Sequence, residues 1–169
     1  MKSLVERYGK WAVVTGASSG IGRAFAPQLA SQGFNLLLTA RRLPLLESLQ
    51  QELKIFPVEV QLFEADLSNA DDVERLITAA QACEPGLLVS NAGFGLKGEF
   101  VRHDAGQLQN MYMANSIHPA QLIHALLPGM LSRKQGGIIV TGSIEGEAPF
   151  PYSAGYAASK AFLHGLVQS

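Results

Sequence analysis

The sequence predicts an α/β fold in which an open, doubly wound parallel sheet is covered by helices on both faces. Three observations predict it. Short apolar runs alternate with longer segments of helical period, the runs contain few polar residues, and a glycine-rich turn follows the first of them. Near-continuous apolar runs are typical of parallel strands buried on both faces. Their alternation with helices is typical of sheets built from strand–helix–strand units.

Each expected element rests on its own pattern. The five expected strands are Trp11–Thr15, Asn35–Thr39, Val58–Phe63, Leu87–Ser90 and Gly137–Thr141. After the third strand, Ser68 is expected to cap a helix, with Asp71 three residues on. Pro44 suits the first turn of the helix after the second strand. Pro27 falls inside the first helix and removes a hydrogen bond, so we expect either a kink or a shifted helix start there.

Size and composition narrow the class of protein. The chain has 169 residues, is 47% hydrophobic and carries a formal net charge of −1. No linker, repeat or low-complexity tract divides it, so residues 1–169 are expected to form a single domain. The charge gives no reason to expect nucleic acid or an anionic membrane as a partner.

Other features bear on location and on metals. The single cysteine, Cys83, suits a reducing compartment. The first eight residues lack an apolar core of signal-peptide length, and no run is long enough to span a membrane, so a cytoplasmic protein is expected. The four histidines show no metal-ligand spacing, and no metal is expected.

A glycine-rich turn, Thr15-Gly16-Ala17-Ser18-Ser19-Gly20-Ile21-Gly22, links the first strand to the first helix. Glycines allow the tight turn and let the backbone approach a pyrophosphate. The N-terminus of the helix offers free N–H groups and the positive end of its dipole to the phosphates. Because the turn follows a strand and opens a helix, it predicts a nucleotide site in a Rossmann-like sheet.

The end of the second strand indicates which nucleotide binds. A site for NAD usually has an acidic residue there to hold the ribose hydroxyls, whereas this chain has Arg41 and Arg42. Guanidinium groups without a carboxylate beside them suit a 2′-phosphate, so NADP(H) is favoured over NAD(H). Arg41 is favoured over Arg42 as the phosphate ligand because it stands nearer the strand end. Surface arginines also often terminate strands, and one of the pair is expected to do only that.

Tyr156 and Lys160 stand four residues apart, and on a helix this spacing places both on one face. A cation beside the phenol favours the phenolate and lowers the phenol's pKa from its ordinary value of about 10. Such a phenol can exchange protons near neutral pH, which the interconversion of an alcohol and a ketone requires. Taken alone, the pair is also an ordinary helix-surface pair, so the rest of the chain must decide.

Further motifs follow the predicted strands in order: Asp66, Asn91-Ala92-Gly93, Asn115 and Ser143. With the glycine-rich turn and the tyrosine–lysine pair, they make the whole chain similar to the short-chain dehydrogenase/reductase family. The separations of 28, 13 and 4 residues from the second asparagine to the lysine match the family's catalytic tetrad. The opening from Tyr8 to Gly16 resembles the branch that contains hydroxysteroid and 3-oxoacyl-CoA reductases.

The resemblance implies a role for each motif. Tyr156 would act as general acid in ketone reduction and as base in alcohol oxidation, while Lys160 would lower its pKa and hold the nicotinamide ribose. Ser143 would hydrogen-bond the substrate oxygen, and Asn115 would anchor a water. Asp66 would accept from the adenine amino group, with the next backbone segment alongside. The implied nucleotide-binding residues, besides Tyr156 and Lys160, are Gly16, Ser18, Ser19, Gly20, Ile21, Gly22, Arg41, Arg42, Asp66, Leu67, Asn91, Ala92 and Gly93.

The chain ends at Ser169, inside the helix expected to carry Tyr156 and Lys160. The resemblance implies further strands and a helix that would cover the nicotinamide, so the fold is expected to be incomplete and the activity of this polypeptide weak or absent. It also implies a homo-oligomer formed through the last two helices, Ala105–Leu131 and Ala154–Gln168.

Three functional interpretations follow from these residues. The leading one is an oxidoreductase that transfers a hydride between NADP(H) and a small carbonyl or secondary-alcohol substrate. A non-catalytic NADP-binding or subunit-interaction remnant of the same fold is the alternative. A methyltransferase would explain the glycine-rich turn but leaves Tyr156 and Lys160 without a role.

Overall fold

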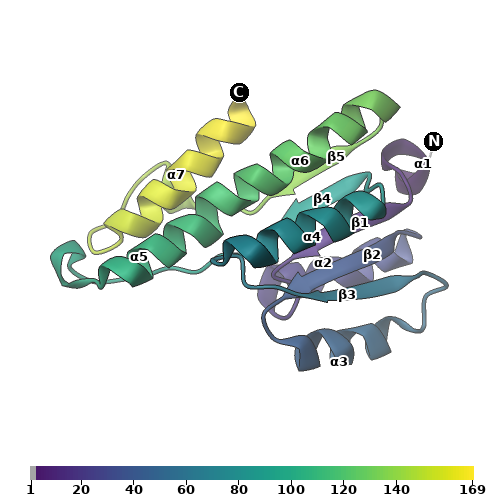
Figure 1. The fold of residues 1–169 in the computed structure, drawn as a ribbon, viewed down its shortest axis with the longest axis horizontal. Coiled ribbons are helices and arrows are strands. Elements are labelled where there is room, and N and C mark those ends of the chain that lie inside the picture. Colours follow the sequence, from purple (N-terminus) through teal and green to yellow (C-terminus); the bar gives the residue numbers. More distant parts are fainter. Residues whose placement is uncertain (1–2) are drawn as a thin grey trace.

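The structure, a computed structural model, describes residues 3–169, so Met1 and Lys2 of the N-terminal segment lie outside the described residues. Its centre is a sheet of five parallel strands in the order β3-β2-β1-β4-β5 (Figure 1). The strands are β1 (Trp11–Thr15), β2 (Asn35–Ala40), β3 (Val60–Glu64), β4 (Leu87–Ser90) and β5 (Gly137–Val140). The expected doubly wound α/β fold is confirmed.

The helices cover both faces of this sheet. They are α1 (Leu4–Tyr8), α2 (Gly20–Ser31), α3 (Leu43–Leu53), α4 (Ala70–Ala82), α5 (Ala105–Tyr112), α6 (His118–Arg133) and α7 (Ala154–Gln168). Three single turns complete the list: η1 (Phe100–Arg102), the π-turn η2 (Met113–Ile117) and η3 (Ile144–Gly146). The long helix expected over residues 105–131 is therefore α5, a π-turn and α6 in succession, and it runs beside α7 (Figure 1).

Strand boundaries agree with the expected ones to within two residues. β1 and β4 match, and β2 ends one residue later than expected. β3 begins two residues late because the N–H of Val58 is taken up in a turn, 2.9 Å from the Phe56 carbonyl oxygen. β5 ends one residue early, although the N–H of Thr141 still reaches the Ser90 carbonyl oxygen at 3.0 Å.

One expectation about helix starts is wrong and two are settled. Asn69, not Ser68, caps α4 with its side-chain oxygen. The Ser68 hydroxyl instead donates to Asp66 Oδ1 at 2.8 Å, and Asn69 is the residue directly before α4. Pro44 stands in the first turn of α3 as expected. α2 keeps its expected start and continues through Pro27, which excludes a shifted helix start.

Alternate side chains of the central strand β1 pack into two separate cores, one on each face of the sheet. In β1, Val14 packs with Leu49 of α3 on one face, whereas Val13 packs with Leu76 of α4 and Leu122 of α6 on the other. All five are at most 1% exposed, and each buried aliphatic side chain contributes about 1.5–3 kcal/mol. Because connections leave β1 and β4 toward opposite faces, their carboxyl ends flank the crevice where such folds bind ligands.

At its β5 edge, the sheet is less covered by other elements than at its centre. Within residues 3–169, β5 pairs with β4 alone, and Ile139 of β5 remains 39% exposed. Among the same residues, no helix combines the length and the apolar character that crossing a membrane requires.

Candidate active site

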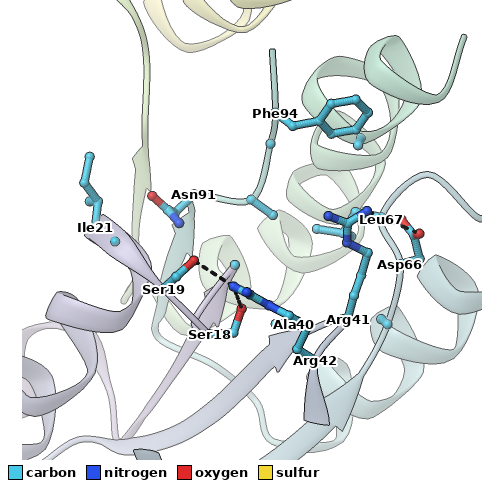
Figure 2. Close-up of a pocket in the computed structure, with 16 residues that line it drawn as sticks. Ser18, Ser19, Ile21, Ala40, Arg41, Arg42, Asp66, Leu67, Asn91 and Phe94 are labelled. Carbon is cyan, nitrogen blue, oxygen red and sulfur yellow. Dashed lines mark hydrogen bonds and ion pairs between the residues drawn. The ribbon is translucent and has the colours of Figure 1, made fainter. Parts of the chain in front are cut away.

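A cleft of about 430 Å³ opens at the carboxyl ends of the central strands (Figure 2). Its walls come from the turn after β1 and from the segments that follow β2, β3 and β4. The lining residues are Gly16, Ser18, Ser19, Gly20, Ile21, Ala40, Arg41, Arg42, Ala65, Asp66, Leu67, Asn91, Ala92, Gly93, Phe94 and Ala114. The predicted nucleotide-binding residues all line this cleft except Gly22, Tyr156 and Lys160.

The glycine-rich turn forms a cradle at the floor of the cleft. Gly16 has φ +68°, and a Cβ on it would lie 2.9 Å from the Ala92 Cα, so only glycine allows this close approach. Gly20 has φ +55°, and a Cβ there would meet nothing within 4 Å, so the space above it is open. Ser19 precedes α2 without capping it by its side chain, which leaves first-turn N–H groups available. This cradle fits a pyrophosphate.

Gly22 and Asn91 support the glycine-rich turn through close contacts and hydrogen bonds. A Cβ on Gly22 would lie 2.5 Å from both the Gly16 carbonyl oxygen and the Asn91 amide nitrogen, so Gly22 supports the turn without lining the cleft. The side chain of Asn91 donates to the Thr15 carbonyl oxygen at 3.2 Å and accepts from the Thr141 hydroxyl at 3.0 Å. Asn91 therefore fixes the ends of β1 and β4 against the residue that follows β5.

The two arginines point to different walls of the cleft (Figure 2). Arg42 Nη2 donates to the hydroxyls of Ser18 and Ser19, at 3.2 and 3.1 Å. Arg41 extends toward Asp66, with 3.9 Å between Nη1 and Oδ2. Arg42, the less favoured of the pair, is thus the one that contacts the glycine-rich turn. Both guanidinium groups border the cleft at the end of β2.

The wall after β3 is held in place by its own hydrogen bonds. Asp66 Oδ1 accepts from the N–H and the hydroxyl of Ser68, at 2.9 and 2.8 Å. The N–H of Asp66 donates to Asp72 Oδ2 at 2.8 Å. This bond, followed by the one from Arg75, holds the pKa of Asp72 below its ordinary value. The loop is therefore preformed, with Asp66 Oδ2 turned toward Arg41.

Tyr156 and Lys160 lie together, as their spacing predicts. Lys160 is 5% exposed, its Nζ donates to the Thr141 carbonyl oxygen at 2.8 Å, and it lies 5.9 Å from the centre of the Tyr156 ring. Burial lowers the pKa of Lys160. A Cβ on Gly93, a lining residue, would lie 3.7 Å from the same Nζ, and one on Gly95 would lie 3.3 Å from the Tyr156 ring. The pair therefore adjoins the segment after β4 that borders the cleft.

Ser143 stands directly before η3 and lines a separate hollow with Leu163 and His164 of α7, not the cleft described above. Its Oγ accepts from the N–H of Glu145 at 3.2 Å, so its own hydroxyl hydrogen can be donated to another group. The turn packs closely on α7, since a Cβ on Gly146 would lie 2.9 Å from the carbonyl carbon of Lys160. The serine is thus anchored to the helix that carries the tyrosine and the lysine.

Asn115 lies in the π-turn and is completely buried. Its Oδ1 accepts from the N–H of Phe94 at 2.9 Å, and its Nδ2 donates to the Phe94 carbonyl oxygen at 2.7 Å and to Ser159 Oγ at 3.1 Å. The amide therefore fastens the segment after β4 to α7. Both ends of this side chain are occupied by protein groups, and its proposed role in anchoring a water stays a prediction.

Comparison with known proteins settles the family. A family model described as short chain dehydrogenase matches residues 10–169. The chain belongs to the short-chain dehydrogenase family. The resemblance of the motifs is thereby confirmed.

Relatives and a solved structure agree with this. The chain is 38% identical over 168 residues to a very-long-chain 3-oxoacyl-CoA reductase of Neurospora crassa, covering 94% of this chain and 51% of that protein. It is 34% identical over 164 residues to the human inactive hydroxysteroid dehydrogenase-like protein 1, covering 95% and 50%. A short-chain dehydrogenase from Sphingobium yanoikuyae in complex with NADPH superposes with a TM-score of 0.89 at 32% identity, covering 94% and 63%. This chain spans about half the length of the curated relatives it matches.

Sequence reasoning missed some lining residues of this short-chain dehydrogenase. They are Ala40, Ala65, Phe94 and Ala114. Small or apolar side chains carry no chemical motif, so only their positions could have indicated them: at the ends of β2 and β3, in the segment that follows β4, or in the π-turn. Thr141 was also missed, because it acts through its backbone carbonyl on Lys160.

Proposed function

We propose that the chain is an NADP(H)-dependent oxidoreductase that acts on a carbonyl or secondary-alcohol substrate, with Tyr156 as the general acid and base. The observation that carries this proposal is the buried ammonium of Lys160, 5.9 Å from the Tyr156 ring and next to a cleft with a phosphate cradle. Membership of the short-chain dehydrogenase family supports it.

Each residue of the site would have its own role in the reaction. The nicotinamide, when bound, supplies the hydride chemistry. Tyr156 would give a proton to the carbonyl oxygen in reduction and take it back in oxidation. The charge of Lys160, fixed by its bond to the Thr141 carbonyl, would favour the phenolate. Ser143, whose Oγ already accepts from the backbone, would donate its hydrogen to the substrate oxygen.

The preference for NADP(H) rests on the end of β2. Arg41 and Arg42 both border the cleft there, and Ser18 lies 3.2 Å from the Arg42 guanidinium. Guanidinium groups suit a phosphate, and an NAD site usually has an acidic residue at this position. The NADPH complex of the Sphingobium relative supports the same assignment.

A non-catalytic protein that binds NADP(H) is the second candidate. It is favoured by the human relative whose name describes it as inactive. Such a protein would keep the cleft and bind the nucleotide without catalysing the reaction. A cytoplasmic location and homo-oligomer formation remain predictions under either candidate.

Replacement of Tyr156 by Phe tests the catalytic role. The polypeptide and its Tyr156→Phe variant are compared for NADPH binding by titration calorimetry and for NADPH oxidation with a panel of ketones. We expect nucleotide affinity within about threefold and a turnover number at least about 100-fold lower in the variant, the loss typical of removing a general acid. Binding without turnover in either protein would favour the non-catalytic candidate, and no nucleotide binding would defeat both.

Replacement of each arginine tests the choice of cofactor. Arg41→Ala and Arg42→Ala are each expected to weaken NADPH binding by about tenfold or more, because hydrogen bonds to charged groups are worth about 1.5–3 kcal/mol. Affinity for NADH, which lacks the 2′-phosphate, should change much less. Dissociation constants for both nucleotides decide the matter. An arginine whose replacement leaves their ratio unchanged does not bind the phosphate.

A further inference from the structure

His118, the first residue of α6, has an environment that the proposed reaction does not explain. It is 1% exposed, and its Nδ1 lies 2.7 Å from the Leu67 carbonyl oxygen. A carbonyl oxygen can only accept a hydrogen bond, so Nδ1 must carry a hydrogen for this contact to be favourable. Burying the polar ring without such a partner would lower the free energy of unfolding by about 1–3 kcal/mol. The contact therefore specifies both the position and the tautomer of the ring.

The carbonyl that His118 holds belongs to a wall of the cleft. Leu67 lines the cleft next to Asp66, and both follow β3 (Figure 2). The other bonds that order this wall come from the loop itself and from the first turn of α4, through Ser68 and Asp72. His118 adds a bond from α6, an element 51 residues further along the chain.

The position of His118 after the π-turn relates it to Asn115. Asn115 holds the backbone of Phe94, which lines the wall after β4, and His118 holds the backbone of Leu67, which lines the wall after β3. The N–H of His118 reaches back to the Met113 carbonyl oxygen, the five-residue step of the π-turn. Both cleft walls are thus fastened within a single turn of one helical rod.

We propose that His118 is a positioning residue for the adenine half of the nucleotide. Its Nδ1–H fixes the Leu67 carbonyl and, through it, the Asp66–Leu67 wall. This inference rests on the proposed binding of NADP(H) and on the expectation that Asp66 accepts a hydrogen bond from the adenine amino group. His118 touches neither the reacting atoms nor the phosphates, and its effect is confined to the geometry of the loop after β3.

The test uses 2′,5′-ADP, which carries the adenine half of the cofactor without the nicotinamide. His118→Asn keeps an N–H close to the position of Nδ1, whereas His118→Leu removes it. Leu122→Ala is the matched control, since Leu122 is equally buried on α6 and does not line the cleft. By calorimetry, the Leu variant should bind 2′,5′-ADP about tenfold more weakly, the Asn variant within about threefold of wild type, and the Leu122 variant within about twofold.

The outcomes separate this inference from the proposed function. Equal binding by wild type and His118→Leu, or an equal loss in Leu122→Ala, would overturn the positioning role and leave the proposed function standing. A wild-type chain that does not bind 2′,5′-ADP would overturn both. A second readout needs no ligand: long-range ¹H–¹⁵N spectra of the imidazole should show a hydrogen on Nδ1 at neutral pH. A ring protonated on Nε2 alone would contradict the proposal.

Discussion

In Lys160, the requirements of fold stability and of catalysis oppose each other. Its ammonium is buried, which lowers its pKa, and it donates a hydrogen bond to a neutral group, the carbonyl oxygen of Thr141. The folded state therefore disfavours the charge that the phenolate of Tyr156 would need nearby. Residues of this kind are typical of functional sites, where electrostatic cost is accepted in return for a perturbed pKa.

Replacement of Lys160 by Met should accordingly abolish turnover and stabilise the fold at neutral pH. The cost of burying the charge is fully present below the lowered pKa of the folded state. It disappears as pH rises through that value toward the ordinary pKa of 10.5. The gain in the free energy of unfolding should thus be larger at neutral pH than near pH 10. Urea unfolding at both pH values measures it, with the exposed Lys54→Met as control. A Met variant less stable than wild type at neutral pH would refute this reading.

At the scale of elements, a single ionised side chain joins the start of α4 to the wall of the cleft. Asp72 accepts from the Asp66 N–H and pairs with Arg75. These contacts lower its pKa, so its stabilising contribution is present above its ordinary pKa of 3.8 and is lost as pH falls below it. Asp72→Asn should reduce the free energy of unfolding by up to about 1 kcal/mol at neutral pH. The difference should vanish in acid, and the exposed Asp71→Asn should show little effect in the same denaturant titrations.

The elements also show what the sequence could and could not predict. The strands were predictable because apolar runs of four to six residues between polar turns have few alternative structures. The cap of α4 was mistaken because Ser68 and Asn69 are adjacent and both are good capping residues, so residue type alone does not show that the helix begins after Asn69. The π-turn was not predictable, because no residue type marks one extra residue in a helical ladder.

Some site residues could likewise be predicted from the sequence, and others could not. Motifs that act through backbone shape, such as Gly16 and Gly20, line the cleft, and the sequence could indicate this because their spacing encodes the turn. Which wall Arg41 and Arg42 each meet could not be predicted, because adjacent side chains leave a strand end in different directions, and the preference for Arg41 as the phosphate ligand stays a prediction. The His118–Leu67 contact joins residues 51 positions apart and carries no local signal.

At the scale of the whole molecule, apolar side chains remain exposed along the two helices that lie side by side at one flank (Figure 1). They are Ile117, Leu127 and Leu131 on the rod of α5, the π-turn and α6, and Phe162, Leu166 and Val167 on α7. A groove of about 550 Å³ lies between α4 and α6, and Phe162 of α7 also lines it. Exposed apolar side chains gathered on neighbouring helices are typical of a site of association.

The predicted homo-oligomer should therefore form through this helical flank, and its disruption can be measured directly. Wild-type chain is expected to show at least the mass of a dimer in size-exclusion chromatography with light scattering. Phe162, 45% exposed beside the groove, is the natural target, because a charge there would be buried without a partner on association. Phe162→Asp should weaken the dimer by about 100-fold or more. Ile55→Asp, at an apolar residue 80% exposed after α3, should leave the mass unchanged. A monomeric wild type, or equal dissociation by both variants, would rule out this interface.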